Sequence, residues 1–176
     1  IAVDEAVSSN SFVFIEDLDS TSGLTTKAVA DAYFTDGSNE EITVDRIDSV
    51  KSASTLITNK SSYINKWYTY SVNSDGKYVL YALTSGRNNA SAAYTTSDNS
   101  TQIVTNGKVD FLQGSSAIAN DKTIMLVKDK DGEVTAYTGT TNIPDINLTS
   151  TNTKPVTVYY STNSKGYTEY AFVDLE

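Results

Sequence analysis

The feature that most constrains this chain is an alternation of apolar and polar residues with a period of two, broken by short turns that contain glycine. Such alternation is typical of β-strands with one buried face, and a glycine-containing turn between two such runs predicts a hairpin. The pairs of runs are residues 28–35 with 41–47, 67–72 with 77–83, 103–105 with 109–112, 123–128 with 133–138, and 156–161 with 167–173. The sequence therefore predicts an all-β fold of antiparallel hairpins, barrel- or sandwich-like.

Helical content is expected to be minimal. The best candidate is residues 48–58, where Ile47, Val50 and Ile57 could share one face of a helix. Serine and threonine are frequent there, and because their side chains compete for backbone hydrogen bonds, any helix should be short. A lone strand is predicted at residues 12–16.

The domain organisation is expected to comprise two small β subdomains, at residues 1–62 and 63–147. Residues 84–100 are polar and are predicted to be a surface loop, and residues 144–155, between two prolines, are predicted to be a linker. The closing hairpin, residues 148–176, either completes the first subdomain or begins a further repeat.

A short internal similarity links the two ends of the chain. Residues 12–18 (FVFIEDL) and residues 170–176 (YAFVDLE) both have an aromatic and aliphatic centre followed by acidic residues and leucine. If the two segments are equivalent, the chain spans one period of a tandem repeat. The chain also begins at Ile1 without methionine, which we interpret as a fragment whose targeting signal lies upstream.

The composition argues against an enzyme. The sequence contains no cysteine and no histidine, which removes thiol chemistry, the commonest general base and the commonest metal ligand. A pair of carboxylates can hydrolyse glycosides without histidine, and Glu16, Asp17, Glu40 and Glu41 are the candidates. Nothing in the sequence brings two of them across a cleft, so we expect no catalytic residues.

Charge and hydropathy argue against two classes of partner. The net charge is −9, which repels phosphate backbones, so we expect no nucleic-acid binding. No apolar run approaches the roughly 20 residues needed to cross a bilayer, so we expect no membrane insertion by this segment.

Acidic turns raise the question of calcium. Residues 128–132 (KDKDG) contain part of a calcium-loop pattern, but lysines interleave and the glutamate of a full EF-hand loop is missing. Aspartate and glycine are also the residues that a plain hairpin turn favours. We therefore expect no cofactor, calcium being the one to test, and we interpret residues 73–76 and 36–37 in the same way.

Aromatic residues on the strand at 67–72 form a candidate binding platform. Tyr68 and Tyr70 share one face of this strand, while Trp67 lies on the other. If exposed, Trp67, Tyr68 and Tyr70 could stack on sugar rings; if buried, the same rings would serve the core or cross-strand pairs.

Four runs together resemble the repeat region of surface proteins of Gram-positive bacteria that carry S-layer homology domains. They are residues 68–81 (YTYSVNSDGKYVLY), 123–127, 134–139 (VTAYTG) and 142–144 (NIP). Residues 12–17 and 170–174 look like the strands that link successive units of such proteins. The mostly helical S-layer homology anchor is absent from this sequence.

The resemblance implies an extracellular location on a bacterial cell surface or cell wall. We therefore expect a non-catalytic structural module of an S-layer-like protein, with neighbouring modules of the same protein or array, or cell-wall glycan, as partners. The alternative is an adhesion module that binds glycan or a host protein.

Overall fold

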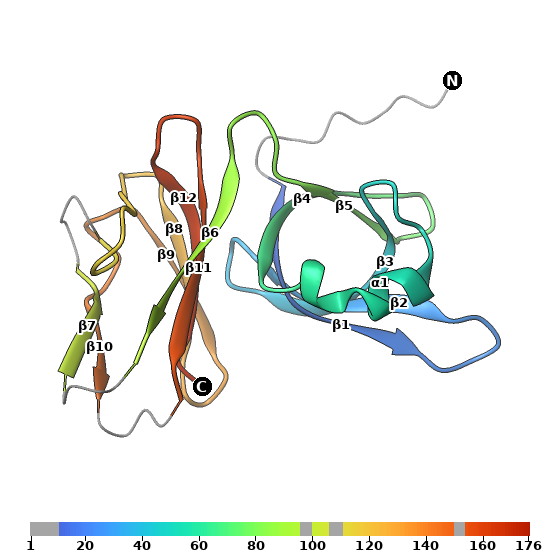
Figure 1. Ribbon diagram of the computed structural model, residues 1–176, viewed down its shortest axis with the longest axis horizontal. Coiled ribbons are helices and arrows are strands. Elements are labelled where there is room, and N and C mark those ends of the chain that lie inside the picture. Colours follow the sequence, from blue (N-terminus) through green and yellow to red (C-terminus); the bar gives the residue numbers. More distant parts are fainter. Residues whose placement is uncertain (1–10, 96–99, 106–110, 150–153) are drawn as a thin grey trace. The chain divides into compact units, whose positions relative to one another are not determined.

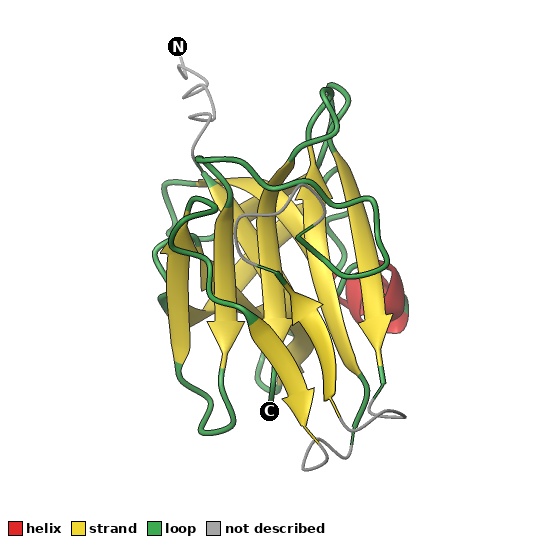
Figure 2. Ribbon diagram, turned by 90° about the vertical axis from the view of Figure 1, so that its left-hand side faces the viewer, coloured by secondary structure: helices red, strands yellow, loops and turns green. Residues whose placement is uncertain are grey.

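The computed structural model describes residues 11–95, 100–105, 111–149 and 154–176, and strands dominate it. The predicted all-β fold is confirmed: these residues contain twelve strands and one short α-helix. Figure 1 labels the strands and colours them along the chain, and Figure 2 shows the helix in red and the strands in yellow. The strands β1 to β5 belong to one compact unit and the strands β6 to β12 to another.

The first unit is a closed five-stranded barrel. Its elements are β1 (Phe12–Thr21), β2 (Lys27–Phe34), β3 (Asn39–Ile47), α1 (Ala53–Thr58), the single 3-10 turn η1 (Lys60–Ser62), β4 (Lys66–Val72) and β5 (Tyr78–Ala82). The strand order is β1-β2-β3-β5-β4, and β4 returns to pair with β1. Only β3 and β5 run parallel, so a crossover must join them, and α1 lies in that crossover.

The barrel core follows from the period-two alternation. On β1, Val13 and Ile15 point inward, and on β2 the small residues Ala28, Ala30 and Ala32 do so. The helix α1 adds Leu56, which is fully buried. Ser52 begins this helix, because its hydroxyl accepts a hydrogen bond from the Thr55 amide at 3.3 Å. A helix is therefore present within the predicted residues 48–58, and it is short, as expected.

The second unit contains two sheets. Its strands are β6 (Asn88–Tyr94), β7 (Ser100–Val104), β8 (Ile124–Lys128), β9 (Val134–Thr138), β10 (Ile146–Thr149), β11 (Val156–Thr162) and β12 (Thr168–Asp174). The larger sheet has the order β6-β11-β12-β8-β9, with β8 and β12 parallel, and the smaller pairs β10 with β7.

One core joins these two sheets in a sandwich-like arrangement. Ile103, Val104, Ile146 and Leu148 come from the smaller sheet, and Phe111 and Leu112 join the same core, where Leu112 forms a bridge with Val104. The larger sheet contributes Tyr94, Met125, Val156, Val158, Tyr160, Ala171 and Val173. The second unit thus buries its apolar side chains in a core distinct from that of the barrel.

The boundary between the units differs from the predicted division at residue 62. It lies after Leu83, because β4 and β5 are needed to close the barrel.

The hairpin predicted to complete the first subdomain or begin a repeat does neither here. It forms β11 and β12, which occupy central positions in the larger sheet of the second unit.

Two segments without apparent pattern are partly strands. The predicted surface loop at residues 84–100 contains β6, where Ala90 and Ala92 pack against the core, and the predicted linker at residues 144–155 contains β10. Four of the five predicted hairpins are confirmed. In the fifth, Val104 pairs with Leu112, and the turn itself lies outside the described residues.

We expect replacement of Leu56 by alanine to lower the free energy of unfolding of the barrel by about 2–5 kcal/mol, because it leaves a cavity in the core. Leu24 provides a matched control, since it is exposed, and its replacement by alanine should change stability by less than about 0.5 kcal/mol. Urea unfolding followed by the fluorescence of Trp67, the chain's only tryptophan, measures both. Equal effects of the two substitutions would contradict a structural role for α1.

Candidate functional site

The three aromatic residues of the predicted platform occupy different environments. Trp67 is 0 % exposed, and its ring lies 5.4 Å from that of Phe14. Tyr68 is also buried; its hydroxyl donates a hydrogen bond to the carbonyl oxygen of Tyr63 at 2.7 Å, and burial raises its pKa. Because Trp67 and Tyr68 are buried, they are better explained as core residues than as a surface on which sugars stack.

Tyr70 is half-buried and belongs to a cluster of three aromatic rings, which we call the aromatic end of the barrel. Its ring centre lies 5.6 Å from that of Phe34 on β2 and 5.4 Å from that of Tyr78 on β5, and the rings of Phe34 and Tyr78 are 6.1 Å apart. All three rings are half-buried and pack against the barrel core. They therefore offer apolar surface that the core only partly covers.

The cluster forms where the inward-facing rows of three strands come to an end. Phe34 follows Ala32 on β2, Tyr70 follows Tyr68 on β4, and Tyr78 precedes Leu80 on β5, each two residues away in its strand. Because side chains two apart lie on the same face, these rows place the rings together. The sequence pointed to Tyr70 but not to Phe34, although the alternation from Ala28 to Phe34 on β2 places Phe34 on the inward face of that strand.

Two further residues complete the aromatic end. Val72 continues the row of Tyr70 and is 47 % exposed. Glu40 lies on β3, two residues before Ile42 and on the same face of the strand. Burial raises the pKa of Tyr78, and the nearby Glu40 carboxylate and Tyr70 raise it further. Apolar ring faces beside hydroxyl and carboxylate groups can stack on a sugar ring and bind its hydroxyls, as amphipathic aromatic residues do at interfaces.

The acidic turn between β8 and β9 is held together by its own hydrogen bonds. Asp129 Oδ1 accepts hydrogen bonds from the amides of Asp131 and Glu133, both at 2.9 Å. The amide of Asp129 donates to the carbonyl oxygen of Glu133 at 2.9 Å, and the amide of Gly132 donates to the carbonyl oxygen of Asp129 at 3.1 Å. The first aspartate thus has a role in the turn that requires no metal.

The same turn occurs twice more, with asparagine in the place of Asp129. Asn73 Oδ1 accepts from the amides of Asp75 and Lys77, both at 3.0 Å. Asn163 Oδ1 accepts from the amides of Lys165 and Tyr167 at 2.9 and 3.1 Å. Because the neutral amide of asparagine accepts the same two hydrogen bonds as the carboxylate, the turn requires an acceptor oxygen at this position rather than a negative charge.

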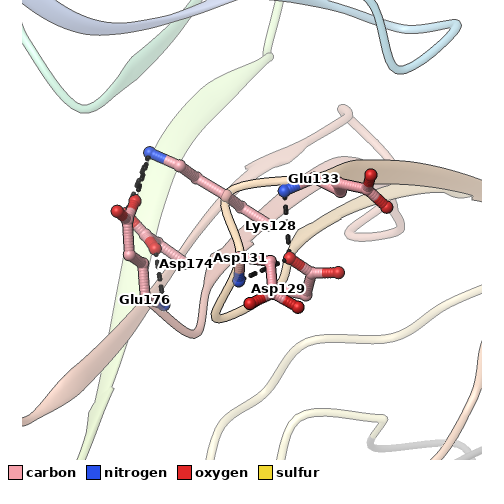
Figure 3. A network of polar contacts seen from close by, with 6 residues as sticks. All are labelled: Lys128, Asp129, Asp131, Glu133, Asp174 and Glu176. Carbon is pink, nitrogen blue, oxygen red and sulfur yellow. Dashed lines mark hydrogen bonds and ion pairs between the residues drawn. The ribbon is translucent and has the colours of Figure 1, made fainter.

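A lysine lies among the acidic residues near this turn (Figure 3). Lys128 Nζ lies 3.0 Å from Glu176 Oε2 and 3.9 Å from Asp174 Oδ2, and its side chain is only 13 % exposed. Asp174 Oδ1 also accepts a hydrogen bond from the amide of Glu176 at 2.9 Å. Within the described ranges, no group of three or more acidic residues is placed to hold a metal ion.

The carboxylates considered for glycoside hydrolysis lie on two strands of the barrel. Glu16 is half-buried on β1, next to Asp17, which forms an ion pair with Lys60 at 2.6 Å. Glu40 and Glu41 are consecutive on β3, so their side chains point to opposite faces of the strand. Neither face therefore carries both glutamates.

Comparisons with known proteins provide no relative for this chain: no family model, no curated protein and no solved structure matches it. In the part of the chain that the structure describes, no helix has the length and apolar character to cross a membrane.

We expect Asp129→Asn to preserve the hairpin and Asp129→Ala to destabilise the second unit by about 1–2 kcal/mol, because two amides lose their acceptor. Asp131→Ala is the matched control; its side chain is exposed, and its loss should change stability by less than about 0.5 kcal/mol. Chemical unfolding monitored by circular dichroism measures these differences. An Asp129→Asn variant as unstable as Asp129→Ala would show that the charge itself matters.

Proposed function

We propose that this chain is a non-catalytic structural module of a bacterial cell-surface protein of the S-layer-like kind, acting outside the cell. The observation that carries the proposal is the self-contained hairpin turn, found in both units, in which Asn73, Asp129 or Asn163 binds the backbone of its own loop. Turns closed by their own side chains suit a protein that must keep its shape without a cofactor.

The architecture supports the same role. Each unit has its own apolar core, and the strands of the barrel close on themselves. A closed barrel has no free edge, which protects an extracellular module against uncontrolled strand pairing. Neighbouring modules of the same protein or array would be the partners of such a chain.

The sequence supports a role without catalysis. Histidine and cysteine are absent, so general-base chemistry would fall to carboxylates. Asp17 forms an ion pair with Lys60, and the side chains of Glu40 and Glu41 lie on opposite faces of β3.

A second function, glycan binding, is favoured by the aromatic end of the barrel. Tyr70 and Tyr78 combine half-buried rings with hydroxyl groups, and Glu40 adds an acceptor for sugar hydroxyls. Cell-wall glycan would be the ligand of a module that lies against the bacterial wall.

The surface location can be tested by treating intact cells of the source organism with trypsin and identifying the released peptides by mass spectrometry. We expect peptides of this chain among those released before lysis, because an outward-facing module is accessible to the protease. A cytoplasmic marker protein, which should stay unreleased, is the control. Peptides that appear only after lysis would overturn the proposed location.

Glycan binding can be tested with soluble cell-wall glycan fragments by isothermal titration calorimetry. We expect Tyr78→Ala to weaken binding at least about tenfold, because burying an apolar side chain of this size against a ligand contributes roughly 1.5–3 kcal/mol. Tyr167, which is 38 % exposed in the second unit, provides the control substitution Tyr167→Ala. Absence of binding by the unmodified protein, or an equal loss in both variants, would exclude the aromatic end as the site.

A further inference from the structure

The strand β6 forms one edge of the larger sheet in the second unit. It pairs with β11 over its whole length, from Asn88 opposite Thr162 to Tyr94 opposite Val156. Among the residues that the structure describes, no strand pairs with β6 on its other side. Alternate backbone amides and carbonyls of an edge strand point away from the sheet, where another strand can bind them.

This edge lacks the features by which proteins usually prevent strand addition. Natural edge strands are short, bulged, interrupted by proline or carry charged side chains. The sequence of β6, NNASAAY, contains seven residues with no charge and no proline, and its register with β11 has no shift. The opposite edge, β9, has five residues and begins beside Glu133, in the acidic group of Figure 3.

The side chains of β6 leave room for a second strand. Ala90, Ala92 and Tyr94 pack against the core of the second unit, and Ser91 and Ala93 alternate with them and are exposed. The side chains at the centre of the strand are therefore small. Because the side chains of a strand point above and below the sheet, those of β6 do not keep a second strand from the usual spacing of about 4.8 Å.

We propose that β6 pairs with β6 of a second copy of this chain, antiparallel and centred on Ser91. This register places Ser91 opposite Ser91, Ala90 opposite Ala92 and Asn88 opposite Tyr94, so both copies keep their core-facing residues on one side. The larger sheets of the two copies join into a continuous sheet of ten strands.

The absence of charge on β6 makes this edge a surface through which two copies of the acidic chain can meet. The chain has a net charge of −9, so two copies repel each other through most surfaces. An edge without charged residues places no like charges opposite each other, and its register about Ser91 is self-complementary, as a two-fold interface requires. The proposal deepens the structural role proposed above, because such a contact joins neighbouring copies, but its test in purified protein is independent of cellular location.

Cysteine substitution tests the register directly, because the chain contains no cysteine of its own. Residues directly opposite each other have Cβ atoms about 4.5–5.5 Å apart, close to disulfide range. Two copies of Ser91→Cys should therefore form a cross-linked dimer under mild oxidation. Ala93→Cys is the matched control: it is exposed on the same strand, but its two copies would lie about 13 Å apart.

We expect cross-linking of Ser91→Cys to be at least about tenfold faster than that of Ala93→Cys, because pairing holds only the first two thiols together. Equal rates would mean random collision and would overturn the proposal. Cross-linking faster at Ala93 would overturn the register and with it the proposed pairing.

Sedimentation analysis of the unmodified protein provides a second measurement. We expect a concentration-dependent dimer that Ser91→Lys abolishes, whereas Thr141→Lys, in an exposed loop, preserves it. Both substitutions reduce the net negative charge equally, so general repulsion cannot explain a difference, and circular dichroism verifies the fold. A protein that stays monomeric at millimolar concentration, or a dimer that Ser91→Lys leaves intact, would overturn the proposal.

Discussion

One side-chain oxygen at the start of a turn determines much of this structure. In the hairpins β4–β5, β8–β9 and β11–β12, the oxygen of Asn73, Asp129 or Asn163 binds two amides of its own loop. The turn sets the register of its hairpin, and a register shift of one residue would move every inward side chain to the other face. The cores of both units therefore depend on these local hydrogen bonds.

The candidate sites arise where this regular pattern ends. The inward rows of the barrel finish in Phe34, Tyr70 and Tyr78, and these rings are half-buried because no further core residue follows them. The barrel closes and has no edge, whereas the larger sheet of the second unit stops at β6. The glycan binding that we propose would belong to the aromatic end, and the assembly that we propose would belong to the open edge.

Local patterns predicted the hairpins, but not the pairings between distant strands. Alternation and turn residues suffice for β4–β5, because both strands and their turn are adjacent in the sequence. The pairing of β1 with β4, which closes the barrel and moves the boundary to Leu83, joins residues such as Val13 and Tyr68, and no local signal marks it. The strand β6 was missed because alanine carries a weak apolar signal. The face of Trp67 was predictable, but its burial was not, because alternation does not show which face is covered.

We propose that the acidic turns hold their shape without a metal, and thermal unfolding in excess calcium and in excess chelator tests this proposal most directly. An ion that binds only the folded state raises the midpoint temperature of unfolding. We predict the same midpoint in both solutions, because Asp129 already binds the amides of its own loop. An increase of several degrees in calcium would contradict the account and would assign the acidic turns to cation binding.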